Sequence, residues 1–156
     1  MNGIQTFADG TPFTVLCGAC GDRTQTGASS TASVRPNVSG NPLPSGFQQT
    51  RTAWFLTSVY STPQLGTLGN SGRNTLRSTG QRATDFSLVK DEIIRENLKL
   101  QLRGEFFNLF SSHFYTPVFP TATMTSSNFG SLYPVGGDAG NLFNPRIIQI
   151  ALRVTF

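Results

Sequence analysis

The residues of this chain that could carry chemistry most directly are its two cysteines, which form the motif C-G-A-C from Cys17 to Cys20. A C-x-x-C pair is typical of redox sites and of one half of a zinc site. A structural zinc site needs four ligands, but the chain has no second pair, and its single histidine, His113, lies far along the sequence. The motif also does not open a helix after a strand, as redox pairs do. We therefore expect a small loop disulfide or two free thiols, and no metal or other cofactor.

A second motif, G-N-S-G-R-N at 69–74, has the glycines of a phosphate-binding loop. It lacks the Lys-Ser/Thr pair of a Walker loop and does not join a strand to a helix, so it is predicted to form turns. The carboxylates follow strand and turn patterns, and no nucleophile–base pair accompanies them. We expect no catalytic residues and no enzyme activity. The carboxylates considered are Asp85, Asp91, Glu92, Glu96 and Glu105.

Composition limits the classes of protein that these residues can belong to. The chain has 156 residues, enough for one domain with a core, and only 13% of them are charged. The net charge is +4 without any run of Lys or Arg, so nucleic-acid binding is not expected. No stretch approaches the ~20 apolar residues of a membrane helix. A membrane barrel remains possible because each of its strands needs only ~10 alternating residues.

The elements that must position the polar residues are strands. Within the last ten residues, I-I-Q-I-A-L-R-V-T-F, apolar side chains alternate with polar or small ones from Ile148 onward, and 98–106 shows the same pattern. We predict four strands with a short turn near 93–97 and two long irregular loops at 17–82 and 111–144. Residues 53–60 could form a short helix or an isolated strand. The strands are predicted at about 4–16, with an interruption near Gly10 and Pro12, and at about 83–93, 98–110 and 146–156.

The two faces of these strands differ in chemistry. One face carries Leu, Ile, Val and Phe, and the other carries more charged side chains than a buried core tolerates. An outer-membrane barrel has this design, with lipid on one face and a wet interior on the other. A soluble or surface-exposed β-sandwich that binds glycan or protein through its long loops alternates in the same way. The long–short–long order of the connections favours the barrel.

Several segments together resemble a known family. Read in order along nearly the whole chain, the sequence resembles the carboxy-terminal end of large TonB-dependent outer-membrane receptors of the Oar-like group, which carry a carboxypeptidase-regulatory-like amino-terminal domain. Each motif is weak alone, but the ordered set is specific. The segments are T-P-F-T-V (11–15), R-P-N-V-S-G-N-P-L-P-S-G (35–46), A-W-F (53–55), G-T-L-G-N-S-G-R-N-T-L-R (66–77), D-F-S-L-V-K (85–90), L-Q-L-R-G-E-F-F-N-L-F (100–110), N-F-G (128–130) and R-I-I-Q-I-A-L-R-V-T-F (146–156).

The resemblance implies an all-β fold: a curved, incomplete antiparallel sheet of about four strands from a transmembrane barrel, with long, poorly packed loops. Family members are several times longer, so residues 1–156 are expected to be a fragment that transports nothing on its own. The implied location is the outer membrane of a Gram-negative cell, with 17–82 and 111–144 outside. The implied partners are outer-membrane lipid, the remainder of the barrel and its plug, and the barrel-assembly machinery. TonB would contact only the missing amino-terminal part.

The resemblance also implies roles for individual residues. One set is expected to face the barrel lumen, a second to form an aromatic girdle near the outer interface, and Phe156 to serve as an assembly signal. Arg103 and Glu105 are further expected to pair across strands. The lumen-facing set is Lys99, Gln101, Arg103, Glu105, Gln149 and Arg153, and the girdle set is Phe106, Phe107, Phe110, Phe114 and Tyr115.

Overall fold

The structure is a computed structural model whose contacts divide the chain into two compact units. It describes residues 1–18, 20–25, 27, 34–113, 115–116, 121–134 and 145–156. The sheet unit comprises Met1–Asp9, Gly80–Phe114 and Gly136–Phe156, and the core unit comprises Gly10–Thr79 and Tyr115–Val135. Phe114, one of the expected girdle residues, lies outside the described residues.

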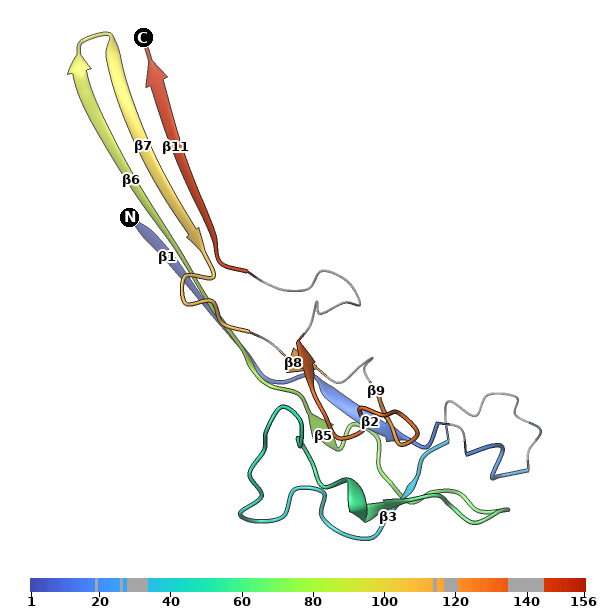
Figure 1. The fold of residues 1–156 in the computed structure, drawn as a ribbon. Coiled ribbons are helices and arrows are strands. Elements are labelled where there is room, and N and C mark those ends of the chain that lie inside the picture. Colours follow the sequence, from blue (N-terminus) through green and yellow to red (C-terminus); the bar gives the residue numbers. More distant parts are fainter. Residues whose placement is uncertain (19, 26, 28–33, 114, 117–120, 135–144) are drawn as a thin grey trace. The chain divides into compact units, whose positions relative to one another are not determined.

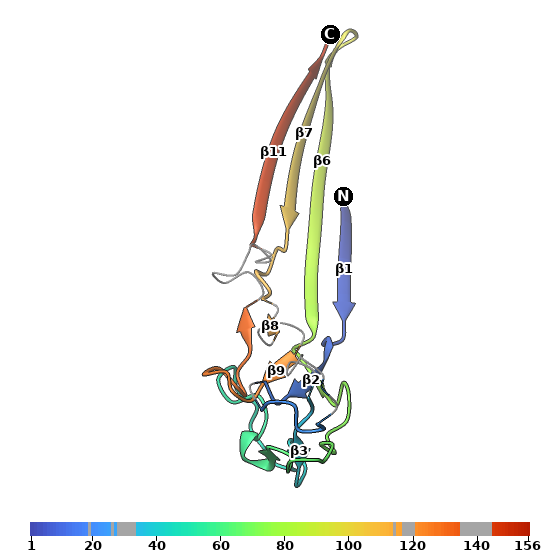
Figure 2. The ribbon, with the colours of Figure 1, turned by 90° about the vertical axis from the view of Figure 1, so that its right-hand side faces the viewer.

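The sheet unit is one antiparallel sheet of four strands in the order β1-β6-β7-β11 (Figure 1). The strands are β1 (Asn2–Ala8), β6 (Gln81–Arg95), β7 (Leu98–Phe107) and β11 (Ile147–Thr155). The long strands bend gently along their length, and the sheet stays open (Figure 2). This confirms the expected fold, a curved, incomplete antiparallel sheet.

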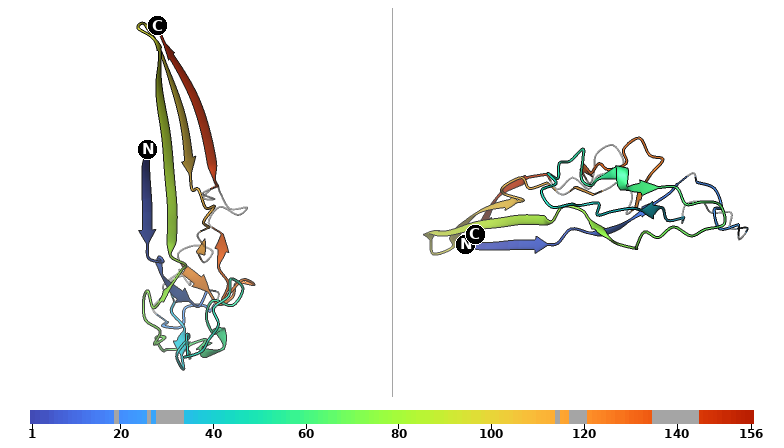
Figure 3. Two further views of the ribbon diagram at one scale, coloured as in Figure 1. Left: turned by 90° about the vertical axis from the view of Figure 1, so that its left-hand side faces the viewer. Right: turned by 90° about the horizontal axis from the view of Figure 1, so that it is seen from below.

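The register of the strands places both long connections at one end of the sheet. β6 and β7 form a hairpin through the short turn at 96–97. At the opposite end, Ala8 of β1 pairs with Gln81, and Phe107 of β7 pairs with Ile147. The last strand therefore pairs antiparallel with β7, as the sequence predicts, and the carboxy-terminus lies beside the hairpin end (Figure 3).

The bounds of the strands differ in part from the prediction. β6 extends two residues beyond each end of the predicted 83–93. The strand expected over 4–16 with an interruption near Gly10 and Pro12 divides there into two strands: β1 ends at Ala8, and β2 (Pro12–Leu16) belongs to the core unit. Between them, Gly10 packs so closely on the Ser78 carbonyl that a Cβ would overlap it, and the proline at position 12 has no N–H to give to a ladder. The strand expected to reach residue 110 ends at Phe107, because Asn108 has a φ of 48° and donates its backbone N–H to Asp85 Oδ1.

The core unit consists of short strands joined by turns. The first three are β2, β3 (Asn37–Val38) and β4 (Tyr60–Ser61), followed by β5 (Leu76–Arg77), β8 (Tyr115–Thr116), β9 (Thr121–Thr123) and β10 (Tyr133–Pro134). They form the sheets β5-β2-β9, β3-β4 and β10-β8. The undecided segment 53–60 contains the 3-10 turn η2 (Thr57–Val59), which leads directly into β4.

The core unit has a well-packed interior, so the expectation of poorly packed loops is wrong. Phe13, Val15, Phe55, Tyr60, Leu76 and Ala122 are buried together. The ring of Phe55 lies 6.0 Å from Phe13 and 5.8 Å from Tyr60, and it meets Phe129 edge-on at 5.3 Å between centroids. Aromatic pairs at these separations stabilise a small core beyond the area that they bury.

The glycine-rich motif at 69–74 has a structural role in this unit. A Cβ at Gly69 would overlap the backbone of Arg35. The Asn70 side chain accepts from the Val38 amide at 2.6 Å and donates to the Val38 carbonyl at 3.2 Å. Asn70 thus supplies the hydrogen bonds of a strand neighbour, and the motif forms a loop with a bend at 73–74 instead of the predicted succession of turns.

Candidate membrane-facing surface

The two faces of the four-stranded sheet differ in chemistry, and register defines each face because residues paired across antiparallel strands share a side. Phe86 pairs with Phe106, which pairs with Ile148. The next rows toward the hairpin continue with apolar side chains from β7 and β11. We call this side the apolar face; its apolar side chains include Phe86, Leu88, Leu100, Leu102, Phe106, Ile148, Ile150, Leu152 and Val154.

The apolar face is open rather than buried. Ile150 is 77% exposed and Leu152 63% exposed, although both belong to a regular strand. Together with Leu88, Leu102, Ile148 and Val154, they form a contiguous exposed apolar surface. A surface of this kind marks contact with a membrane or a partner, because water is a poor solvent for it.

The opposite side, the polar face, carries all six residues expected to line a lumen. Glu105 pairs with Gln149, and Gln101 pairs with Arg153. Gln101 Nε2 donates to Asp91 Oδ1 at 2.7 Å across β6 and β7. Arg103 and Glu105, expected to pair across strands, instead pair with each other along β7, with Nη1 and Oε1 3.7 Å apart. Lys99 lies opposite Thr155.

The expected girdle residues do not form one belt in the structure. Phe106 lies on the apolar face, where its ring centroid is 6.3 Å from that of Phe86. Phe107 is the next residue along β7 and therefore lies on the polar face, opposite Ile147. Phe110 follows the strand and is 72% exposed. Tyr115 belongs to the core unit, where the Arg51 guanidinium lies 5.9 Å from its ring centroid.

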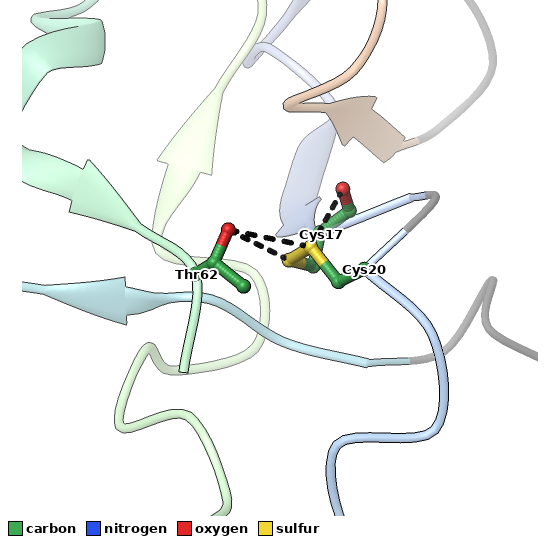
Figure 4. Close-up of a disulfide and its surroundings, with 3 residues drawn as sticks. All are labelled: Cys17, Cys20 and Thr62. Carbon is green, nitrogen blue, oxygen red and sulfur yellow. Dashed lines mark hydrogen bonds between the residues drawn. A yellow bond between two sulfur atoms is a disulfide. The ribbon is translucent and has the colours of Figure 1, made fainter. Parts of the chain in front are cut away.

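The cysteines form a disulfide, which settles the alternative that the sequence leaves open. Cys17 and Cys20 are bonded to each other, and the Thr62 hydroxyl approaches both sulfurs (Figure 4). Cys17 is fully buried, and its amide donates to the Val34 carbonyl at 2.7 Å. The disulfide thus has a structural setting, at the end of β2 in the core unit.

In the described part of the chain, no group of three or more His, Cys, Asp or Glu side chains could hold a metal ion. The same residues contain no helix that is long and apolar enough to span a membrane. His113 lies in the segment that follows β7 and is exposed.

Sequence reasoning missed two residues of this face of the sheet. Phe86, whose ring lies next to that of Phe106, follows the alternation of D-F-S-L at 85–88 and was predictable. Lys90 and Glu92 also lie on this face, opposite Leu102 and Leu100. Their signal was present too, because continuing the alternation from Phe86 and Leu88 leads directly to them. The sequence alone indicated only that alternation weakens near residues 89–90.

The open four-stranded sheet and its exposed apolar face are typical of one class of protein, the membrane β-barrels, in which such a sheet forms part of the wall. The chain matches the family model described as outer membrane beta barrel domain over residues 1–149, and it belongs to this family. Neither a curated protein nor a solved structure matches it. The family places the protein in the outer membrane and decides against the alternative of a soluble sandwich.

Proposed function

We propose that this chain forms wall strands of a TonB-dependent receptor of the Oar-like group, and that it transports nothing on its own. The observation that carries the proposal is the two-faced sheet: along β7 and β11, exposed aliphatic side chains line one face, and charged and polar side chains line the other. Lipid suits the first face and a wet lumen suits the second. The family membership supports the barrel, and the ordered motifs of the sequence support the receptor group.

The proposed topology follows from where the connections leave the sheet. β1, β6, β7 and β11 cross the membrane, with the hairpin turn at 96–97 in the periplasm. The connecting segments, 9–80 and 108–146, leave the sheet at the opposite end and lie outside the cell. Outer-membrane barrels have short periplasmic turns and longer extracellular loops, as here.

The partners follow from the same proposal. Lipid contacts the apolar face, and the plug faces Lys99, Gln101, Arg103, Glu105, Gln149 and Arg153. The open edges of β1 and β11 accept the remainder of the barrel, since an unpaired strand edge is a template for pairing. Phe156 is the proposed contact of the barrel-assembly machinery, and TonB contacts only a part outside this chain.

Solubility behaviour tests the proposal. The chain is expressed with an outer-membrane targeting signal, and membranes are extracted first with alkaline carbonate and then with detergent. We expect the chain to stay in the membrane pellet through carbonate and to enter solution only with detergent. A chain that is folded and monomeric in plain buffer would contradict the membrane assignment. Uptake of a ligand by cells that carry only this chain would contradict the proposed lack of transport.

A further inference from the structure

Charged side chains interrupt the apolar face toward both ends of β6. Arg82, paired with Phe7 of β1, lies near the end where the long connections leave. Lys90 and Glu92 lie toward the hairpin, opposite Leu102 and Leu100 of β7. A charged side chain in hydrocarbon is costly, so the positions of these residues limit where the hydrocarbon can lie.

The spacing of the charges matches the height of a membrane. Ten residues separate Arg82 from Glu92 within one strand, which is a rise of ~33 Å along the strand. At a strand tilt of about 40°, that rise spans roughly 25 Å across the bilayer, the height of the apolar band of outer-membrane barrels. Arg82 and Glu92 therefore fit the two membrane interfaces.

Apart from Lys90, which forms an ion pair with Glu92, the residues of β6 between the two interfaces on this face suit the hydrocarbon. Phe86 and Leu88 occupy the middle of this stretch of β6. Nearer to Arg82, the Thr84 hydroxyl donates to Gln5 Oε1 at 2.6 Å, and Gln5 Nε2 donates to the Ala83 carbonyl at 3.1 Å. These polar groups satisfy one another, which is what a polar pair in an apolar medium needs.

The ion pair near the hairpin presents one positive and one negative charge, which a lipid headgroup with both charges can complement. Lys90 Nζ and Glu92 Oε2 are 3.4 Å apart, and the side chains remain 74% and 60% exposed. One cation and one anion side by side offer a partner to a headgroup that also carries both charges. Lys90, with its long aliphatic stem, can lie along the apolar face while its ammonium reaches the interface.

We infer that Lys90 and Glu92 bind the headgroup of a zwitterionic phospholipid, phosphoethanolamine in chemistry, at the hairpin end of the sheet. Lys90 donates to the phosphate, and Glu92 accepts from the primary ammonium. A choline headgroup has no N–H to donate, and a glycerol headgroup has no cation, so each loses one half of the contact. The inference rests on the proposed function in one respect, namely that the apolar face contacts lipid.

The test compares two matched pairs of substitutions in the whole chain, reconstituted in phosphatidylcholine bicelles. The first variant is Lys90→Gln/Glu92→Gln. The control is Arg103→Gln/Glu105→Gln, which removes an ion pair of 3.7 Å from the polar face. Each bicelle sample contains a small equal fraction of phosphatidylethanolamine and phosphatidylglycerol, and native mass spectrometry counts the lipids that stay bound.

We expect the unaltered chain and the control to retain phosphatidylethanolamine in preference to both other lipids. The Lys90→Gln/Glu92→Gln variant should lose that preference by roughly fivefold, the size expected from one exposed ion pair. Equal retention by the two variants would overturn the inference. Retention of phosphatidylglycerol at the level of phosphatidylethanolamine in the unaltered chain would also overturn it.

A second readout separates this inference from the proposed function. A nitroxide at Ile150→Cys reports whether the apolar face meets lipid, through its accessibility to dissolved oxygen against a water-soluble nickel chelate. If the label is accessible to nickel chelate rather than to oxygen, the proposed function fails. If the label meets lipid and no phosphatidylethanolamine preference is found, only the headgroup site fails.

Discussion

Phe86 and Phe106 face each other across β6 and β7 on the apolar face, with their ring centroids 6.3 Å apart and Ile148 next to Phe106 in the same row. In this row, three neighbouring strands present large apolar side chains on the same face of the sheet. Phe107, one residue along the chain, lies on the other side of the sheet. The membrane assignment therefore predicts lipid contact at Phe106 and contact with the wet interior at Phe107.

The substitution Phe106→Arg should impair folding into a membrane, because it places a charge on the apolar face. The expected loss is about 2 kcal/mol, within the range for Arg near the middle of a lipid-facing surface. Gln149→Arg is the control, since its side chain lies on the polar face opposite Glu105. Urea unfolding in liposomes measures both. Equal stability of the two variants would argue against lipid contact at Phe106.

The core unit should depend on Phe13, which is only 1% exposed and packs against Phe55. We expect Phe13→Ala to lower the free energy of unfolding of this unit by about 3 kcal/mol through lost burial and a cavity. Phe110→Ala, at a residue that is 72% exposed, should change it little. The fluorescence of Trp54, which packs against the core and donates to the Arg77 carbonyl at 2.7 Å, reports the transition. An unchanged midpoint for Phe13→Ala would refute the described core.

The Cys17–Cys20 disulfide should be formed in the protein from an oxidising compartment. Alkylation before reduction should modify neither thiol, and alkylation after reduction should modify both, as read by intact mass. Replacing both residues by Ser should cost the core unit about 2 kcal/mol, as expected for a very short loop. Labelling of both thiols without reductant would show that the disulfide is absent.

The stability of the core unit should fall at high pH because of Tyr60. Burial raises the pKa of the Tyr60 phenol from its ordinary value of 10.0, and a hydrogen bond with Thr75 partly opposes this. The folded unit therefore holds the proton more tightly than the unfolded chain does. Its contribution to stability is complete below pH about 10 and is lost as the pH rises through the raised pKa. Tyr60→Phe should flatten this decline in urea unfolding; an identical slope in both proteins would count against it.

The sheet was predictable because its strands are long and their side chains alternate between apolar and polar. The strand 98–107 and the last strand each repeat an apolar side chain at every second position, and a one-residue slip would exchange their faces. The polar face was predictable for the same reason, since Lys99, Gln101, Arg103 and Glu105 occupy alternate positions of one strand. Register then fixed which of them face Gln149 and Arg153.

The core unit was not predictable because its order depends on contacts between distant segments. β2 pairs with β5 and with β9, which are separated from it by tens of residues of turn-rich sequence. Phe13, Phe55, Tyr60 and Phe129 meet only when these segments come together. No periodic pattern of apolar residues within a short stretch of sequence predicts such contacts. The break near Gly10 and Pro12 was predictable from these two residues, whereas the contact of Gly10 with the distant Ser78 was not.

The most direct test of the membrane-facing sheet is a scan of β11 with single nitroxide labels from 147 to 155 in the chain reconstituted into bilayers. Oxygen and nickel-chelate accessibilities are measured at each position. We predict a period of two, with oxygen access highest at Ile148, Ile150, Leu152 and Val154 and nickel access highest at Gln149, Ala151 and Arg153. Equal access of the nickel chelate to both faces, or its exclusion from both, would contradict a sheet with lipid on one side and water on the other.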